Sequence, residues 1–392
     1  MPGKDWPNYN KSLINKVVKT LTAGKINYTS ERYGKIFEKK FSNFVGNKYS
    51  VAICNGTVAL EIAIKSLKIP KGSEILVTAR SFFSSASCIV NTGNKPVFLD
   101  VNLFTQNISI EEIKRKITKK TKVIICVHLA GLPCDMREIK KICKISNIKI
   151  IEDCSQAHGA SIDGKQVGSF GDVSTWSFCT DKIISTLGEG GMISTNNKFI
   201  YKFALETINH GSVEVKNQNL SEKFIYNKNS FGSNFRITEI QSLAGIEQLK
   251  NLKKTQKIRE KMAKDFSKVI SSYKNKINYY FPKKNIKSAW YRFYFFINPN
   301  LKNKNKLRLE IITQLKKKNI RVYTGSCPEI YLEKSFKKLK NFSSKRLINC
   351  KILGETSVAL DVNHTLTKIN HKINLIKINN ILNNILNKKW AS

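Results

Sequence analysis

Acidic residues are scarce in this chain: its 392 residues include 28 Asp and Glu against 68 Lys and Arg, a formal net charge of +40. Such a basic chain suggests a protein that binds nucleic acid or an anionic membrane. Lys, Asn and Ile are over-used together, however, as in "KINHKINLIKINNILNNILNKK" (368–389), so compositional drift explains the charge without a function. The sequence has no RNP-like aromatic motif, zinc-finger spacing or basic region with heptads. We therefore expect no nucleic-acid partner, although the charge would help to steer an anionic substrate.

Long apolar runs and paired cysteines are also lacking. No stretch approaches 18 uninterrupted apolar residues, so no membrane span is expected. The first ten residues, "MPGKDWPNYN", have no apolar core of a signal peptide. The nine cysteines form no CxxC pair, and some lie in apolar runs such as "VIICVHLAG" (123–131), which favours free thiols in a reducing compartment. These features predict a soluble, cytoplasmic protein without a metal site.

What the chain does contain is an alternation of short β-rich runs and helical stretches, beginning near residue 50. Predicted strands cover 49–54, 73–79, 95–101, 121–129 and 148–154. Predicted helices cover 57–67, 84–93, 109–117 (with Ser109 as its N-cap) and 136–146. This alternation predicts an α/β fold with a mainly parallel sheet between helices. Ligands of such sheets bind at the carboxyl ends of the strands.

The pattern changes near residue 236. Residues 236–270 read as one long helix or a pair, residues 289–297 as an aromatic strand and residues 309–320 as a helix. A chain of this length is too long for one ordinary domain. We therefore predict a large domain with an N-terminal arm over 1–250 and a smaller C-terminal α+β domain over 251–392.

Two polar features follow predicted strands. Asn55-Gly56-Thr57 lies between a strand and a helix, where a tight turn and the first N–H groups of the helix can bind an anion. Such a turn occurs in most α/β proteins and is a weak signal alone. Glu152 and Asp153 end a buried strand, where a carboxylate needs a cation or hydrogen-bond donors. A structural ion pair and a catalytic carboxylate both explain this acidic pair.

Lys182 lies in "WSFCTDKIISTLGEGGMIST" (176–195), between two stretches that look buried. Lysines are rarely buried unless they are paired or used. A lysine held against apolar groups is more readily neutral, and a neutral amine is a nucleophile. A fourth polar feature, "GSNFRITEIQ" (232–241), is a turn that leads into the long helix.

The order and spacing of these features resemble the fold-type-I pyridoxal-phosphate (PLP) enzymes, and within them the DegT-type nucleotide-sugar aminotransferases. The similar segments are "NGTVAL" (55–60), "GNKPVFLDV" (93–101), "IEDCSQAHGASIDGKQVGSFGDVSTWSF" (151–178), "DKIISTLGEGGMISTNN" (181–197) and "FGSNFRITEIQSLAGIEQL" (231–249). They are spread over most of residues 25–370. The resemblance implies the PLP-dependent transferase fold type I.

The resemblance also implies roles for individual residues. Lys182 would form the internal aldimine with pyridoxal 5'-phosphate and then move the proton between substrate and cofactor. Asp153 would keep the pyridine nitrogen protonated, so that the ring accepts electrons. Gly56, Thr57 and Ser177 would bind the cofactor phosphate.

Three further positions match residues that surround the cofactor in this family. Phe82 would place an aromatic ring over the pyridine face, and Gln156 would lie near the phenolic oxygen. Asn234 would reach the phosphate from the neighbouring subunit, which implies a homodimer with a shared active site.

Several polar residues near the predicted strand ends keep two interpretations. For His128 we favour a hydrogen-bonded structural role, whereas His158 is equally compatible with a structural and a functional one. Tyr291 and Arg292 could reach a nucleotide phosphate or could cover the interface between the domains.

The resulting functional prediction is a PLP-dependent aminotransferase that moves an amino group from L-glutamate to a nucleotide-linked keto sugar. A 4-keto-6-deoxyhexose for surface polysaccharide such as the O-antigen of lipopolysaccharide is the favoured acceptor, on resemblance alone. The alternatives are a 3-keto-sugar aminotransferase, a PLP-dependent sugar dehydratase, and a basic nucleic-acid-binding or regulatory protein with a vestigial PLP fold. Family members that dehydrate carry histidine where this chain has Lys182, so transamination is favoured. The sequence does not identify the sugar, the nucleotide or the carbon that is aminated.

Overall fold

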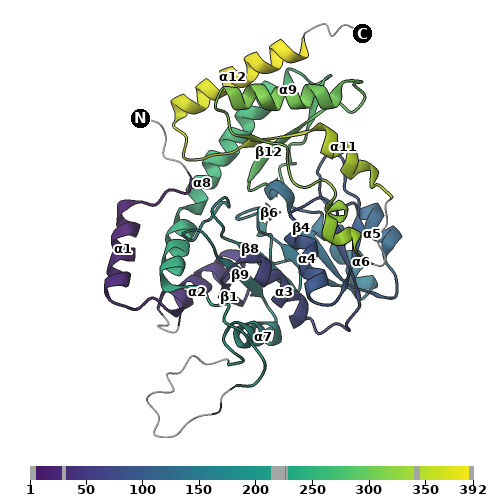
Figure 1. The fold of residues 1–392 in the computed structure, drawn as a ribbon. Helices are drawn as coiled ribbons and strands as arrows, with labels where there is room; N and C mark the ends of the chain where they lie inside the picture. Colours follow the sequence, from purple (N-terminus) through teal and green to yellow (C-terminus); the bar gives the residue numbers. More distant parts are fainter. Residues whose placement is uncertain (1–5, 29–31, 213–225, 227, 340–344, 388–392) are drawn as a thin grey trace.

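A seven-stranded sheet forms the centre of the larger part of the molecule (Figure 1). The computed structural model describes residues 6–28, 32–212, 226, 228–339 and 345–387. The strands lie in the order β1-β9-β8-β5-β4-β2-β3, and β9 is the one that runs antiparallel to both of its neighbours. Their bounds are β1 (Tyr49–Ile53), β2 (Glu74–Thr78), β3 (Lys95–Leu99), β4 (Thr121–Val127), β5 (Lys149–Asp153), β8 (Val173–Ser177) and β9 (Gly191–Thr195).

Helices cover both faces of this sheet, which is why its strands are almost continuously apolar. One face packs against α3 (Gly56–Ser66), α4 (Ser84–Asn91) and α7 (Lys198–Ile208). The other packs against α2 (Tyr33–Val45), α5 (Ile110–Lys116) and α6 (Met136–Ile145). The N-cap predicted for α5 is confirmed, because Ser109 Oγ accepts the N–H of Glu112 at 3.3 Å.

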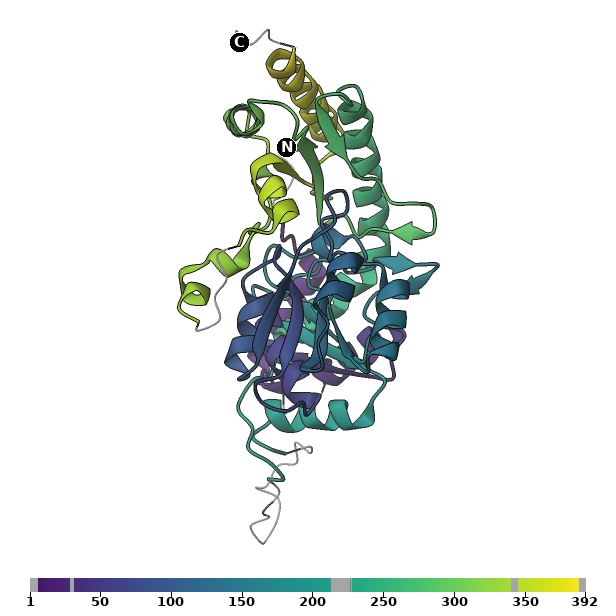
Figure 2. The ribbon, with the colours of Figure 1, turned by 90° about the vertical axis from the view of Figure 1, so that its right-hand side faces the viewer.

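A second, antiparallel sheet of four strands lies above the first in Figure 2. Its order is β10 (Ile277–Tyr279), β12 (Arg292–Ile297), β14 (Ser357–Asp361) and β13 (Val322–Tyr323). Phe293 and Phe295 of β12 point into a core that lies between this sheet and the helices that pack on it. Helices α9 (Lys304–Lys317) and α12 (Lys368–Leu386) pack in this core, and α11 (Ile348–Thr356) packs in a separate cluster with Tyr294 and Phe296 of β12. The short helix α10 (Lys334–Lys337) packs instead on the core of the larger sheet through Phe336.

A long helix and a short pair of strands help to join the two sheets. Helix α8 (Glu239–Ser271) starts at a capping box formed by Thr238 and Gln241, packs on α2 where Gly245 meets Phe37, and continues into the core of the smaller sheet. The short strand β11 (Ile286–Lys287) pairs with β6 (Ser161–Ile162), which pairs in turn with β7 (Lys165–Gln166). A domain boundary at residue 250 would fall inside α8, and it stays a prediction.

The predicted fold class is confirmed by this architecture. The long segment 236–270 is one helix rather than a pair, and the aromatic strand starts at Arg292 rather than at residue 289. Helix α9 starts at Lys304, five residues before the predicted start. The prediction started late because the first turn of this helix is polar and shows no apolar periodicity. Within the described ranges, no helix combines the length and apolarity needed to cross a bilayer.

Candidate active site

A cavity of 810 Å³ opens at the carboxyl ends of β1, β2, β4, β5 and β8, and residues of β12 and β14 close its far side. Its volume is that of an ordinary small-molecule site. Seven of the eight residues predicted from the sequence line it: Gly56, Thr57, Phe82, Asp153, Gln156, Ser177 and Lys182. The sheet therefore brings together residues that lie up to 126 positions apart.

The N-terminus of α3 forms one end of the cavity. The side chain of Asn55 caps this helix by accepting the N–H of Val58 at 2.9 Å, which leaves the N–H groups of Gly56 and Thr57 for an anion. A Cβ atom on Gly56 would lie 2.8 Å from the Cβ of Ser177. Glycine therefore allows β8 to bring the hydroxyl of Ser177 against the helix terminus.

Glu152 and Asp153 have opposite environments, because successive side chains of a strand point to opposite faces. Asp153 lines the cavity, where Oδ2 accepts from the hydroxyl of Ser85 at 3.0 Å and Oδ1 accepts from the N–H of Ser155 at 3.1 Å. Each interpretation of the acidic pair thus suits one residue, since Asp153 faces the cavity and Glu152 does not.

Glu152 is completely buried behind the cavity and is fully hydrogen bonded. It accepts from His128 Nε2 at 3.1 Å and from the backbone N–H groups of Gly168, Phe170 and Gly171. Burial opposes ionisation, yet the hydrogen bond from His128 and the backbone donors hold the pKa of Glu152 below its ordinary value. The carboxylate therefore ties β5 to the loop that precedes β8.

The two histidines left open by the sequence are both buried and neither lines the cavity. His128 donates to Glu152 and accepts from the N–H of Cys134 at Nδ1, as expected for a structural residue. His158 lies between Trp176 and Phe178, and neither ring nitrogen has a hydrogen-bond partner among the described residues. Burial and the nearby positive charges of Lys182 and Arg259 lower the pKa of His158 to about 3, so the ring is neutral.

Lys182 extends into the cavity from the loop between β8 and β9. Its Nζ lies 3.2 Å from Asp181 Oδ1 and 5.1 Å from the ring centre of Tyr291, whose hydroxyl donates to Asp181 Oδ2. The amine expected among apolar groups therefore has a carboxylate neighbour. The lysine backbone is held as well, because its carbonyl accepts the indole N–H of Trp6 at 2.8 Å.

Phe82 and Gln156 both line the cavity, but only the side chain of Gln156 is held by a hydrogen bond that the structure shows. The phenyl ring of Phe82 is 67% exposed, so it is free to cover a flat ligand. Gln156 accepts the N–H of Ala130 through Oε1 at 2.7 Å, which orients its amide N–H₂ group.

Arg292 lies at the junction of the two sheets and also lines the cavity, so both interpretations of its position are compatible with the structure. Its guanidinium is held between the rings of Tyr291 and Tyr323, at 4.4 and 4.5 Å, and is 2.7 Å from Asp361. Asn234, in contrast, is exposed, pairs with Asn209, and does not line the cavity of its own chain. Its role toward a neighbouring subunit stays a prediction.

Sequence reasoning missed several cavity residues. Ser85 and the turn at 325–327 carry no recognisable motif, because they reach the cavity only through the pairing of strands and the packing of the smaller sheet. Asp181 had an available signal, since it directly precedes Lys182 in the chain.

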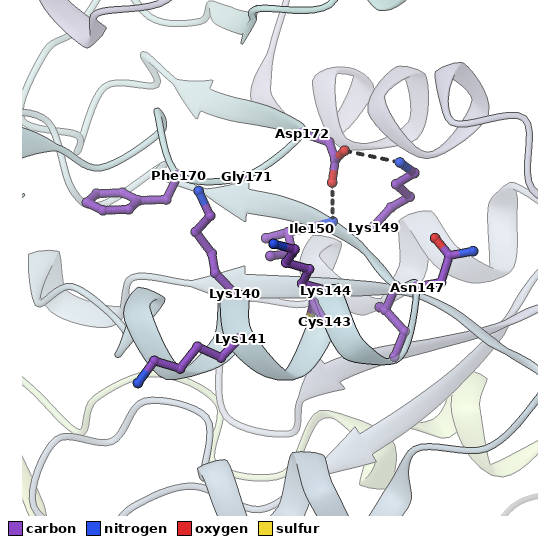
Figure 3. Close-up of a pocket in the computed structure, with 11 residues that line it drawn as sticks. Lys140, Lys141, Cys143, Lys144, Asn147, Lys149, Ile150, Phe170, Gly171 and Asp172 are labelled. Atoms are coloured by element: carbon purple, nitrogen blue, oxygen red, sulfur yellow. Dashed lines mark hydrogen bonds and ion pairs between the residues drawn. The ribbon is translucent and has the colours of Figure 1, made fainter.

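A second hollow, of 590 Å³, lies beside α6 and is shown in Figure 3. Lys140 and Lys144 extend from α6 toward the segment 170–172, and Asp172 binds Lys149 and the N–H of Ile150. This hollow lies at the amino end of β5, on the opposite edge of the sheet from Asp153. It therefore has no part in the cavity that contains Lys182.

One group of buried residues has the composition of a metal site. Ligand atoms of His128, Glu152 and Cys154 lie within 4.8 Å of one another. The facing atoms of His128 and Glu152 are already joined by a hydrogen bond, and Glu152 accepts three backbone N–H groups as well. These contacts give the group a structural role in the strand ends.

Comparison with known proteins identifies similar chains. A model of the DegT/DnrJ/EryC1/StrS aminotransferase family matches residues 7–373. An uncharacterised protein of Methanocaldococcus jannaschii is 32% identical over 358 residues, 91% of each chain. The GDP-perosamine synthase of Escherichia coli O157:H7 is 39% identical over 240 residues, which span 61% of this chain and 62% of that relative. The solved structure of the aminotransferase from Psychrobacter cryohalolentis has a TM-score of 0.93 at 35% identity, and covers 98% of this chain and 100% of its own.

Proposed function

Because this chain belongs to the DegT/DnrJ/EryC1/StrS aminotransferase family, we propose that it transfers an amino group from L-glutamate to a nucleotide-linked keto sugar, with pyridoxal 5'-phosphate as cofactor. The observation that carries the proposal is the meeting of Lys182, Asp153 and the N-terminus of α3 in one cavity. Family membership establishes the general class, a PLP-dependent sugar aminotransferase. The donor, the sugar and the residue roles are proposals.

The residues around the cavity fit this cofactor. The close approach of Gly56 and Ser177 leaves a cradle that a Cβ atom would fill, beside N–H groups suited to a phosphate. At another wall a carboxylate, Asp153, accepts hydrogen bonds and has room for a protonated ring nitrogen. When bound, pyridoxal 5'-phosphate supplies an aldehyde and a ring that accepts electrons.

The chain's own residues then have separate tasks. Lys182 presents the primary amine that attaches the cofactor, and while free it moves a proton at Nζ. Asp153 holds a proton at the ring nitrogen, and Ser85 orients the Asp153 carboxylate. Phe82 covers one face of the ring and excludes water from it.

Several observations support a nucleotide-linked sugar as the acceptor. Relatives that match about six-tenths of this chain are named GDP-perosamine synthase. Arg292 places a fixed guanidinium in the cavity, where a diphosphate would find its charge complement. The favoured acceptor is a 4-keto-6-deoxyhexose for surface polysaccharide.

We extend the proposal to the assembly and the compartment. A homodimer would bring Asn234 of one subunit to the cavity of the other. Helix α1 (Lys11–Thr22) exposes Ile14, Val18 and Leu21 on one face, which suits contact with a partner. All nine cysteines are free, which favours the cytoplasm.

The proposal is tested by loading purified protein with pyridoxal 5'-phosphate and reducing it with borohydride. We expect a visible absorption band and, by peptide mass spectrometry, cofactor fixed to Lys182. Lys182→Ala should lose both the fixed cofactor and the formation of 2-oxoglutarate from glutamate and a keto sugar. Lys283→Ala, an exposed lysine outside the cavity, serves as the matched control and should behave as the natural protein.

The same assay separates the rival functions. A 3-keto-sugar aminotransferase would form 2-oxoglutarate with a different sugar, and a dehydratase would consume the sugar without amination. A protein that stays colourless with the cofactor, and binds DNA tightly in low salt only, would contradict the proposed enzyme.

A further inference from the structure

Asp181 precedes Lys182 in the chain and is also its partner in space. The two carboxylate oxygens of Asp181 lie 3.2 and 3.3 Å from Lys182 Nζ. The hydroxyl of Tyr291, just before β12, donates to Oδ2 of the same carboxylate. Tyr291 is itself buried and packs against the guanidinium of Arg292. The position of the carboxylate is thus fixed from the smaller sheet and not by its own loop alone.

Two opposing effects act on the Lys182 amine. The lysine side chain is only 17% exposed, and burial disfavours an ammonium ion. A carboxylate at ion-pair distance favours the ammonium ion. The second effect depends on one side chain that is itself 48% exposed, so it can be removed without opening the core.

The charged and titratable groups around this pair come from three parts of the chain. Cys179 and Glu189 belong to the loop of Lys182. Arg292 is the first residue of β12, and Tyr291 directly precedes it. His158 is buried near enough to Lys182 for the lysine charge to act on it. Burial opposes ionisation of Asp181, but the charge of Lys182, the hydroxyl of Tyr291 and the charge of Arg292 together lower the pKa of its carboxyl. These contacts favour the carboxylate form of Asp181, which is the form that pairs with Lys182.

We propose that Asp181, positioned by Tyr291, is the counter-ion of the free Lys182 amine and restrains the reactivity of that amine. Asp181 acts through the lysine, so it is a positioning residue of the site. The catalytic meaning of the pair rests on the proposed aminotransferase function. The ion pair itself does not, since it is a property of the chain without cofactor.

The direct test measures the Lys182 amine in cofactor-free protein. The natural protein and Asp181→Asn are treated with a trace of acetic anhydride between pH 6 and 10, and acetylation of Lys182 is compared with that of exposed Lys283 by mass spectrometry. Below the pH at which the amine is fully neutral, the Asn variant should be acetylated about tenfold faster, because an opposite charge at this distance shifts such equilibria by at least that factor.

Two variants act as controls. Asp181→Glu keeps the carboxylate and should restore slow acetylation. Asp163→Asn makes the same chemical change in an exposed turn, where Asp163 binds Arg137 and Asn285, and should leave Lys182 unaffected. Circular dichroism spectra establish that each variant is folded. Acetylation of Asp181→Asn within twofold of the natural rate, in folded protein, would overturn the proposal.

The loaded enzyme provides a second readout. The acid side of the pH profile of kcat, which reports groups of the complex in which the Lys182 amine is free, should move about one pH unit lower in Asp181→Asn. A purely structural defect would lower the rate equally at all pH values. If the natural protein fixes no cofactor at Lys182, the aminotransferase function fails while the acetylation result still decides the role of Asp181. If Lys182 binds the cofactor but neither readout moves, the inference alone is wrong.

Discussion

Glu152 and Asp153 are consecutive residues that should respond in opposite ways to loss of charge. Glu152 accepts from His128 and three backbone N–H groups in a completely buried place. Glu152→Gln would point an amide N–H₂ group at donors, and an unsatisfied buried group of this kind costs about 2–4 kcal/mol. We expect this loss in the free energy of unfolding at pH 7, measured by urea titration.

The pH dependence of this difference has a definite sign. The pKa of Glu152 is below its ordinary value in the folded protein. Its stabilisation is therefore present above the pKa of a free glutamate, about 4.3, and disappears as the pH falls through the lower value in the folded state. An unfolding difference between Glu152→Gln and the natural protein that stayed constant down to pH 3 would contradict this assignment.

Asp153→Asn should instead affect turnover. The asparagine is nearly the same size, and its Oδ1 can still accept from Ser155, so we expect the stability to change by less than about 1 kcal/mol. A neutral amide does not hold a proton at a ring nitrogen. The transamination rate should therefore fall on the order of a hundredfold or more, the usual effect of removing one electrostatic group from an active site. Equal loss of stability in the two variants would argue against separate roles.

The residue scale also shows what the sequence could predict of the site. Gly56 and Asp153 lie at the carboxyl ends of predicted strands or just after them, so their meeting followed from the parallel sheet. Ser177 ends β8 and Lys182 follows it, and this strand was not predicted, so their place in the site came from the family resemblance. That Glu152 and Asp153 point to opposite faces of the sheet could be predicted from the strand assignment alone. The contact of Asp181 with Tyr291 joins residues 110 positions apart and depends on how the smaller sheet packs, which no local pattern encodes.

At the scale of elements, residues 6–10, which precede α1, lie against the loop of Lys182 and hydrogen bond to it. We call this segment the N-terminal strap. Trp6 donates to the carbonyl of Lys182, and the hydroxyl of Tyr9 accepts the N–H of Leu187 and contacts Ser185. These bonds hold a loop that must keep Lys182 in place without the hydrogen bonds of a sheet or helix.

Tyr9→Phe removes two of these contacts without removing the ring. We expect faster hydrogen exchange in residues 182–190, by about fivefold to tenfold, since one or two hydrogen bonds contribute roughly 1 kcal/mol each. Hydrogen–deuterium exchange with mass spectrometry measures this directly. Tyr273→Phe, which loses a hydroxyl bonded to Asn379 far from the loop, is the matched control and should leave the loop unchanged.

The elements themselves were largely predictable. The strands and helices between residues 49 and 154 follow from apolar runs and helical periodicity, with end shifts of one or two residues. The two-residue strands β6, β7 and β11 are too short to have a period, and their pairing depends on how the two sheets pack. The N-terminal strap was equally hidden, because Trp6 and Tyr9 act through distant partners.

At the scale of the whole molecule, acid should destabilise this protein through charge and through buried histidines. The net charge is already +40 at pH 7. Burial is the main reason that the pKa values of His158 and His364 fall to about 3. An unfolded histidine has a pKa near 6.5, so below that value the unfolded state binds protons that the folded state rejects. Stability therefore falls as the pH drops from about 6.5 toward 3.

His158→Phe should remove part of this acid sensitivity. The ring lies between Trp176 and Phe178 and makes no hydrogen bond among the described residues, so a phenyl ring suits the place. Between pH 7 and pH 5 the variant should lose about 2 kcal/mol less unfolding free energy than the natural protein, by the linkage of one histidine. His210→Gln, an exposed histidine, should retain the natural slope. An unchanged slope in His158→Phe would show that the repulsion between positive charges dominates.

The continuous helix α8 and the pairing of β11 with β6 have a consequence for how ligands reach the cavity. These two connections hold the larger and the smaller sheet, which form the two sides of the cavity, in a fixed arrangement. A hinge rotation of one sheet against the other would bend the 33-residue helix α8 and break the pairing of β11 with β6. Access of ligands to the cavity then depends on rotamer changes of exposed lining side chains such as Phe82. Enzyme held in a crystal lattice should therefore still exchange its bound molecules.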